Sequence, residues 1–136
     1  MQDMQAFNRA LIEEFRANGG KLSGQMAKST LLLLTTTGAK SGTERVTPLG
    51  FAKDGERLIV IAANAGAPAH PDWYYNLLAH PDVTVEVGAE RFAAHATTAA
   101  TADRERLIAL IPYFHAQQEK TTRVIPIVIL ERVGVA

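Results

Sequence analysis

The sequence of residues 30–53 is TLLLLTTTGAKSGTERVTPLGFAK, and this stretch decides the fold. Residues 30–37 are apolar or β-branched, which is typical of a strand. Two glycines within residues 38–42 indicate a turn, and residues 45–53 alternate in polarity, which predicts a second strand. Because the turn is short, we expect the two strands to pair in the antiparallel sense.

The segments that follow extend this antiparallel pattern. Asp54-Gly55 is a tight-turn signal, and residues 57–63 predict a third strand, so that a three-stranded meander is expected. Residues 83–87 and 91–97 predict a further hairpin. Residues 124–130 predict a last strand. Its continuous apolarity indicates burial on both faces, and Pro126 should place it near an edge or a bulge.

Four helical segments are expected between and before these strands. Residues 1–20 contain an amphipathic helix that ends at Gly19-Gly20, with apolar side chains at Met4, Phe7, Leu11, Ile12 and Phe15. Its polar face carries charges of both signs, so it should pack against the domain rather than on a membrane surface. Pro71 can open a short helix over residues 72–79.

Thr101 is expected to cap a third helix, which Pro112 ends before a fourth helical segment at residues 113–119. Residues 64–70 are rich in Gly, Pro and Ala and indicate a loop. About six strands with three or four helices predict a mainly β, α+β fold. We expect residues 1–136 to form a single domain, a small antiparallel barrel with added helices.

Composition narrows the class of protein. Fourteen basic and 14 acidic residues balance, which disfavours a nucleic-acid partner, and the absence of cysteine excludes disulfides and thiolate metal sites. The apolar runs are too short for a membrane span, and the N-terminus lacks the features of a signal peptide. A cytoplasmic location is therefore expected, with peripheral membrane contact and a homodimer left open.

The charges are unevenly distributed along the chain. Residues 21–53 carry one acid, Glu44, and five cations: Lys21, Lys28, Lys40, Arg45 and Lys53. A local positive field in a neutral protein suits a small anionic ligand, although ordinary scatter of charge explains the same count.

Protein-borne catalytic groups are not indicated by any motif. The four histidines (His70, His80, His95 and His115) lack the spacing of a helical metal site, so no metal is expected. The serines lack a nucleophile-elbow setting, and no carboxylate pair is a clear general acid–base candidate.

The turn at residues 38–42 is the most informative local feature. Its glycines permit backbone amides to converge on an anion, while Lys40, Ser41 and Arg45 add positive charge and a hydroxyl. The free amides at the start of the helix after Pro71 could also hold an anion. The glycines and cations of this turn are also compatible with an ordinary hairpin that binds nothing. The aromatic cluster Trp73-Tyr74-Tyr75 is also compatible with simple packing of the helix onto the barrel.

Four motifs together resemble a known family. They are Thr35-Thr36-Thr37-Gly38-Ala39-Lys40-Ser41-Gly42, Arg45-Val46-Thr47-Pro48-Leu49, Pro71-Asp72-Trp73-Tyr74-Tyr75-Asn76-Leu77 and Arg123-Val124-Ile125-Pro126-Ile127. In this order and spacing they resemble the deazaflavin (coenzyme F420)-dependent nitroreductase family, over residues 31–130. The resemblance implies a split antiparallel β-barrel, related to flavin-reductase and pyridoxamine-phosphate-oxidase domains.

The resemblance also implies which residues contact the cofactor. Ala39, Lys40 and Ser41 would hold its phosphate and acidic tail, with Arg45 beside them. The deazaflavin ring would be bordered by two strands, the start of a helix and one aromatic side chain: Val46, Thr47, Pro48, Leu49, Gly50; Ile61, Ala62, Ala63, Asn64; Asp72, Trp73, Tyr74, Tyr75, Asn76; and Phe114.

The sequence departs from the family pattern in its tail contacts and its substrate pocket. Ala39 and Asn64 stand where family members often have basic residues, so Lys21, Lys28 or Lys53 could contact the tail instead. The pocket positions of the nitroreductase correspond to Gly50, Ala63, Ile111, Phe114 and Gln117, none of which carries a hydroxyl. A wider, more apolar pocket is expected, without activity on bicyclic nitroimidazoles.

The resemblance implies an F420H2-dependent oxidoreductase that transfers a hydride to an electron-poor small molecule such as a quinone or an activated enone. The cofactor supplies the reactive group, which fits the absence of a protein nucleophile. The proton could come from solvent or from Tyr113. Two alternatives remain: an FMN-dependent oxidoreductase on the same fold, and a non-catalytic deazaflavin-binding carrier.

Overall fold

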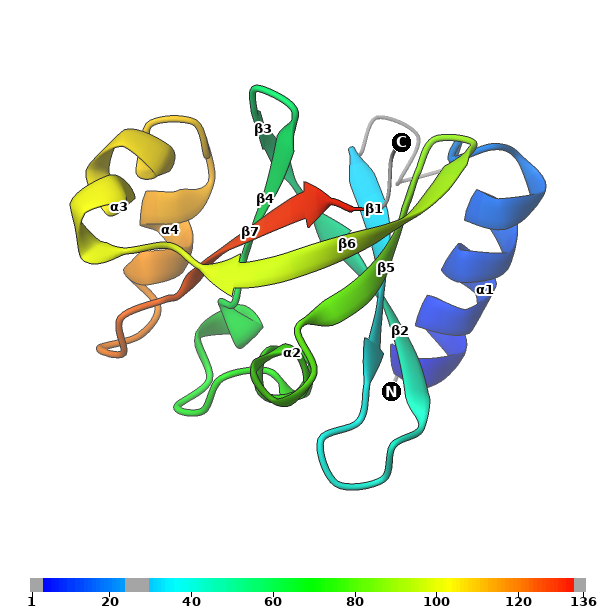
Figure 1. The fold of residues 1–136 in the computed structure, drawn as a ribbon, viewed down its shortest axis with the longest axis horizontal. Helices are drawn as coiled ribbons and strands as arrows, with labels where there is room; N and C mark the ends of the chain where they lie inside the picture. Colours follow the sequence, from blue (N-terminus) through cyan, green and yellow to red (C-terminus); the bar gives the residue numbers. More distant parts are fainter. Residues whose placement is uncertain (1–3, 24–29, 134–136) are drawn as a thin grey trace.

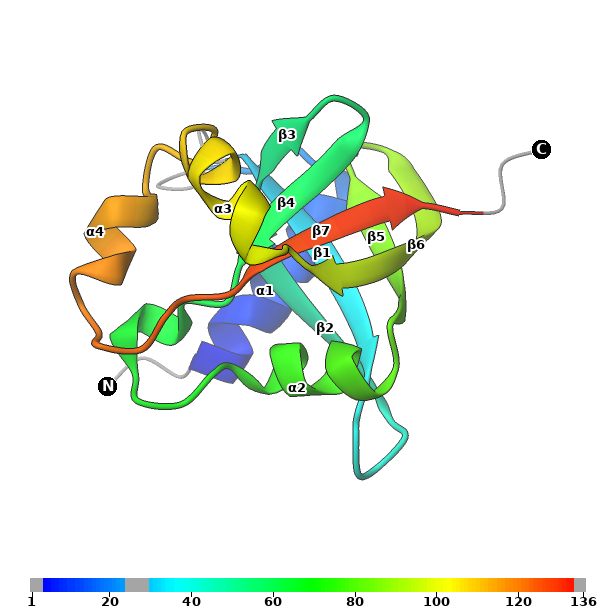
Figure 2. The same cartoon turned by 60° about the vertical axis from the view of Figure 1, so that its left-hand side comes forward.

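One curled, antiparallel sheet dominates the computed structural model, which describes residues 4–23 and 30–133. Seven strands lie in the order β2-β1-β5-β6-β7-β4-β3. Their bounds are β1 Leu31–Thr37, β2 Glu44–Gly50, β3 Ala52–Asp54, β4 Arg57–Ile61, β5 Asp82–Val87, β6 Glu90–Thr98 and β7 Ile127–Arg132. The helices are α1 Met4–Ala17, α2 Asp72–Ala79, α3 Thr101–Ile108 and α4 Phe114–Gln118, with a 3-10 turn, η2, at Asn64–Gly66. Figures 1 and 2 show their arrangement.

The two edges of the sheet are consecutive in the chain. β2 pairs with β1 along its whole length, whereas β3 pairs with β4, and only Phe51 separates β2 from β3. The predicted strand at residues 45–53 is therefore a bent segment that belongs to both edges. This continuity curls the sheet into a barrel. It places the β1–β2 turn and the β3–β4 hairpin at opposite ends of the molecule (Figure 1).

The pairings of the predicted meander are confirmed, because the 45–53 segment pairs with β1 through β2 and with β4 through β3; the bend that divides it was not predicted. The placement of Pro126 near a sheet edge is wrong. β7 lies between β6 and β4, and Pro126 precedes it, where no ladder N–H is required. The carbonyl of Pro126 accepts a hydrogen bond from the Ala62 amide at 3.0 Å. The predicted burial of this strand on both faces is confirmed for Ile127 to Leu130.

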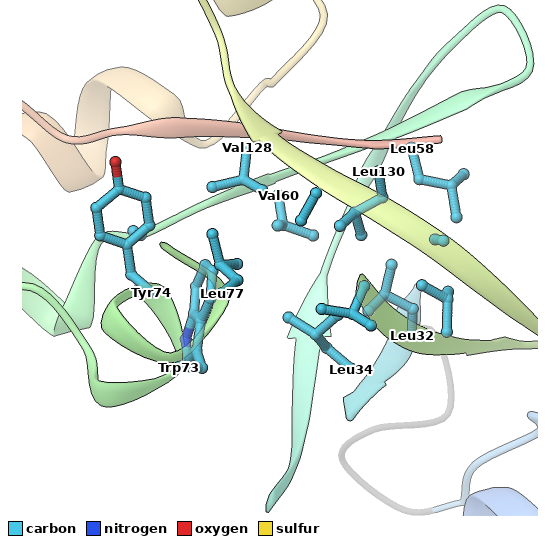
Figure 3. Close-up of a cluster of buried hydrophobic side chains, with 14 residues drawn as sticks. Leu32, Leu34, Leu58, Val60, Trp73, Tyr74, Leu77, Val128 and Leu130 are labelled. Atoms are coloured by element: carbon cyan, nitrogen blue, oxygen red, sulfur yellow. The ribbon is translucent and has the colours of Figure 1, made fainter. Parts of the chain in front are cut away.

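Two apolar clusters form on opposite faces of β4 and β7. Alternate residues enter each cluster, because successive side chains of a strand point to opposite faces. Leu58, Val60, Val128 and Leu130 fill the barrel interior with Leu32 and Leu34 of β1, and α2 adds Trp73, Tyr74 and Leu77 (Figure 3). Ile59, Ile61, Ile127 and Ile129 face outward, where they are covered by Leu107 of α3, Phe114 of α4 and Ile111 between these helices.

The amphipathic helix α1 packs against the sheet, as predicted. Leu11 and Phe15 are buried, and Arg16 donates to the buried carboxylate of Glu86 on β5 through Nε at 3.0 Å and Nη2 at 2.8 Å. Gly20 ends this region with φ +89°, and a Cβ there would lie 2.6 Å from the Gly88 Cα, so the close approach requires glycine. The side chain of Met4 lies outside the described residues.

The expected cap at Thr101 is wrong. Ala100 occupies the N-cap of α3, Thr101 is the first helical residue, and no side chain caps this helix. No helix among the described residues is long and apolar enough to cross a membrane.

Asp54 links the β3–β4 hairpin to α3, and this link should make stability depend on acid pH. Hydrogen bonds from Arg106 and from Arg57 lower the pKa of Asp54 from its usual 3.8 to about 2. A carboxylate whose pKa falls on folding contributes stability above pH 4, and the contribution is lost as the pH falls towards 2. We expect Asp54→Asn to lower Tm by a few degrees at pH 7, with the difference from wild type shrinking between pH 4 and pH 2 in thermal melts.

Asp82→Asn is the matched control, because the Asp82 side chain is 89% exposed and its ion pair is with the exposed His95. An equal loss of Tm in both variants would contradict a specific role for Asp54.

Candidate functional site

A groove of about 950 Å³ lies between the β1–β2 turn, β2, α2 and α1. It brings together ten of the residues predicted to contact the cofactor and one that was not predicted, Asn8 of α1, with Gly38 of the turn completing the lining. The ten are Ala39, Lys40, Ser41, Arg45, Val46, Thr47, Asp72, Trp73, Tyr75 and Asn76.

Close packing shapes the β1–β2 turn. A Cβ at Gly38 would displace Ser41 Oγ and lie 3.2 Å from the Thr43 carbonyl oxygen, and Gly42 adopts φ +69°, which favours glycine. The Gly38 amide donates to the Thr43 carbonyl at 2.8 Å, and the Gly42 amide donates to the Gly38 carbonyl at 2.9 Å. The turn is therefore held by its own backbone.

Most backbone amides of the turn already donate hydrogen bonds within the protein, so fewer of them can bind an anion than the two glycines of the turn led us to expect. The Ala39 amide donates to Asn76 Oδ1 at 2.9 Å, and the Thr43 amide donates to Ser41 Oγ at 3.1 Å. Among the described residues, only the amides of Lys40 and Ser41 in this turn lack a partner. These two amides and the Ser41 hydroxyl proton remain available to a ligand.

Asn76 supports the turn from α2. Its side chain is buried, accepts from the Ala39 amide and donates to Thr36 Oγ1 at 3.3 Å. Both of its polar atoms are thus used inside the protein, and Asn76 shapes the predicted tail site from behind.

The positive end of the groove is the β1–β2 turn. Lys40 and Arg45 are exposed there, and within residues 4–23 and 30–133 neither forms an ion pair with a carboxylate. Asp72 places a negative charge on the α2 wall. An anion is therefore held best on the side of Lys40 and Arg45.

The other cations proposed for the tail lie elsewhere or are not described. Lys53 lines a separate cavity of about 570 Å³, at the end of the barrel that carries the β3–β4 hairpin. Lys21 is exposed beyond the end of α1 and does not line the groove, and Lys28 lies outside the described residues.

Several predicted ring contacts lie outside the groove. Tyr74 is buried, and its hydroxyl pairs with Thr98 Oγ1 at 2.8 Å, so it faces the core as Figure 3 shows. Pro48 and Leu49 are half-buried on β2 and also lie outside the groove lining. The packing interpretation of the aromatic cluster therefore holds for Trp73 and Tyr74, which are both buried, while Tyr75 is exposed in the groove.

The residues predicted for the ring edge and the substrate pocket gather around α4. Ile61, Ile111 and Phe114 are buried in the outer apolar cluster, with Ala63 and Tyr113 packed against it, and Gln117 is half-buried on α4. Because Ile111 and Phe114 are core residues, the accessible positions of this set are Gly50, Ala63 and Gln117.

Tyr113 has the one buried side-chain polar atom of the described residues without a hydrogen-bond partner. Its hydroxyl lies 3.7 Å from the point where a Cβ on Gly50 would stand, beside the predicted ring strand. Burial raises the pKa of Tyr113 above its usual value, so the phenol keeps its proton at neutral pH.

The loop after β4 has a strained backbone. Asn64 and Ala65 adopt φ +50° and +52°, and non-glycine residues in this region cost roughly 1–2 kcal/mol each. Asn64 donates through Nδ2 to the Ala69 carbonyl at 2.9 Å, so its amide closes the loop.

These features fit an anionic cofactor with a flat ring. Two cations and two amides that have no partner among the described residues suit a phosphate and an acidic tail, and the phenol beside β2, likewise without a described partner, suits a polar atom of a ligand. Sequence reasoning missed Asn8, because one polar residue on an amphipathic helix carries no signal of what it will face.

Comparisons with known proteins identify the family of this chain. The model of the family described as F420H(2)-dependent quinone reductase matches residues 7–132. An F420H(2)-dependent quinone reductase of Mycobacterium tuberculosis is 36% identical over 126 residues, which cover 87% of this chain and 85% of that protein. A solved F420-H2 dependent reductase shares 34% identity with a TM-score of 0.66, covering 75% of this chain and 94% of that one. A structure described as a domain-swapped dimer shares 30% identity with a TM-score of 0.68, covering 95% of this chain and 100% of that one.

The matches confirm the predicted resemblance, the split β-barrel, the enzyme class and the cofactor. Because the family model covers most of the chain, this protein belongs to the F420H(2)-dependent quinone reductases, oxidoreductases that depend on coenzyme F420.

Proposed function

We propose that this protein transfers a hydride from reduced F420 to a quinone or an activated enone. The observation that carries the proposal is the groove with two cations at its turn end, Lys40 and Arg45, which form no ion pair within the part of the chain that the structure describes. When bound, the reduced deazaflavin supplies the hydride, and the acceptor takes up that hydride together with one proton.

The β1–β2 turn would bind the phosphate and the glutamyl tail. The amides of Lys40 and Ser41 donate to phosphate oxygens, and the side chains of Lys40 and Arg45 neutralise the carboxylates. Val46, Thr47 and Trp73 line the same groove, and the rest of the cofactor would extend along them. The chain thereby orients the cofactor, and its own residues bind without forming a covalent bond.

Tyr113 is the proton donor that this arrangement supports best. Its hydroxyl is buried, adjacent to Gly50 and without a hydrogen-bond partner among the described residues, and it is protonated at neutral pH. A hydroxyl already engaged by the protein would first have to break a hydrogen bond.

The acceptor site would be bordered by Gly50, Ala63 and Gln117, whose side chains carry no hydroxyl. An apolar ring such as a quinone suits this composition, while nitroimidazoles that need hydroxyl contacts are expected to be poor substrates. A single domain, a homodimer like the solved domain-swapped relative, and a cytoplasmic location stay predictions for this chain.

Turnover with a panel of acceptors tests the proposed reaction. We expect reduced F420 to be oxidised by quinones and enones, followed by the return of its absorbance and fluorescence, with little rate on nitroimidazoles. Tight binding without oxidation by any acceptor would favour the carrier alternative. Binding of FMN with no response to F420 would favour the FMN-dependent alternative.

Replacing Lys40 tests the tail site. Lys40→Ala should weaken F420 binding about fivefold, because a partly exposed charge pair contributes roughly 1 kcal/mol. It should leave unchanged the affinity for a deazaflavin without phosphate and glutamyl tail, measured by fluorescence titration. High salt should reduce the difference.

Lys53→Ala provides the comparison, because Lys53 lines the cavity at the other end of the barrel. A larger loss of affinity in Lys53→Ala than in Lys40→Ala would show that the tail binds away from the turn.

Replacing Tyr113 tests the proton donor. Tyr113→Phe removes a buried hydroxyl without a partner, so Tm should not fall. The kcat for quinone reduction should drop at least about tenfold, since general acids contribute roughly 100-fold or more, while F420 affinity is retained. An unchanged kcat at all pH values would assign the proton to solvent.

A further inference from the structure

Arg123 makes an unusual set of contacts that the reaction described above leaves unexplained. Its guanidinium donates to three carbonyls of the loop after β4: Ala62 at 3.2 Å, Ala63 at 2.7 Å and Ala67 at 3.2 Å. A fourth bond runs from Nη1 to His70 Nδ1 at 2.6 Å. Arginine can only donate, so His70 is held neutral with its proton on Nε2.

These acceptors lie in the segment that contains the strained residues Asn64 and Ala65. Strained backbone persists only where its surroundings over-determine it, and Arg123 spans the strained turn from Ala62 to His70. Gly66 adds a close contact in the same region, because a Cβ there would lie 2.6 Å from Lys120 Cβ, just beyond α4.

The backbone of Arg123 is tied to α4. Gln118 on α4 donates through Nε2 to the Arg123 carbonyl at 2.6 Å, and its Oε1 accepts from the Ile125 amide at 3.1 Å. The Ile125 carbonyl accepts from Arg104 of α3, whose guanidinium carbon lies 5.8 Å from the centre of the Phe114 ring. A continuous set of bonds therefore joins the loop to α4.

We propose that Arg123 is a positioning residue for the F420-dependent reaction: it holds residues 62–70 against α4 and so sets the position of Ala63 relative to Gln117. These two residues border the proposed acceptor site, and the inference therefore rests on the proposed function. Arg123 touches neither cofactor nor acceptor and acts through the loop that it holds.

This role requires the planar arrangement of N–H donors that a guanidinium has. Four acceptors surround it in directions that five fixed N–H groups can reach together, whereas a lysine ammonium supplies three donors from one point. Arg123→Lys thus keeps the charge and removes most of the bonding pattern.

Hydrogen exchange of the full-length protein, without cofactor, tests the link itself. In Arg123→Lys the amides of residues 62–70 should exchange about tenfold faster than in wild type, while those of β1 and β5 stay protected. Gln118→Leu breaks the link one step away and should have the same effect, so the test survives poor folding of either variant.

Kinetics then separate positioning from stability. At saturating F420, kcat for quinone reduction should fall about tenfold in Arg123→Lys. In Arg123→Lys the affinity for the tail-free deazaflavin should also fall. The affinity for intact F420 should fall by the same factor, because the contribution of the tail at the β1–β2 turn is unchanged. Arg91→Lys, an exposed arginine on β6, is the matched control and should match wild type in every measurement.

The outcomes are distinguishable. Unchanged exchange of residues 62–70 would overturn the link, and faster exchange with wild-type kcat and ring affinity would reduce Arg123 to a purely structural residue and overturn the proposal. A wild-type protein that neither binds F420 nor reduces a quinone would overturn the proposed function, and the positioning role with it.

Discussion

The closure of one sheet on itself is the constraint on which the rest of the structure depends. β2 and β3 are opposite edges of the sheet but consecutive in the chain, so residues 50–52 can exist in this conformation only if the sheet curls. Curling creates an interior that α2 closes at one end, and it buries apolar strands that an open sheet would expose (Figure 3). It also separates the cationic β1–β2 turn from the cavity that contains Lys53.

Binding capacity at the turn is defined by the polar groups that the protein leaves unpaired. Hydrogen bonds within the turn occupy the amides of Gly38, Gly42 and Thr43, and Asn76 of α2 accepts from the Ala39 amide, so the turn is held in one conformation. What remains is a small set of donors around Lys40 with Arg45 nearby. A rigid set of free donors binds an anion without first losing conformational entropy. A chain with no net charge can therefore carry a strongly positive site.

On the outer face of β4 and β7, the same contacts serve both packing and the candidate site. The isoleucines of this face are buried by α3, α4 and the segment between them. This cover brings Phe114, Tyr113 and Gln117 to the loop that follows β4, where the strained residues Asn64 and Ala65 lie. Packing and site geometry are thus set by the same contacts. The hydrogen bonds of Arg123 and Gln118 fix the loop after β4 relative to α4, which non-directional apolar contacts alone would not do.

Local pattern in the sequence was sufficient for the strands, the helices, the turn at residues 38–42 and, through four motifs in register, the family and its cofactor. These are short-range features, because periodicity, glycine geometry and motif spacing act within a few residues. Pairing was not local. The edge position of Pro126 was wrong, and the bend that divides the 45–53 segment between the two sheet edges was not predicted, because both depend on the closure of the whole sheet. Three further features were decided only by the tertiary structure: the burial of Ile111 and Phe114, the hydrogen bonds of Asn76, and the bonds from Arg123 to carbonyls that precede it by 56 to 61 positions in the chain. The partners of a side chain depend on which distant segments the barrel brings into contact.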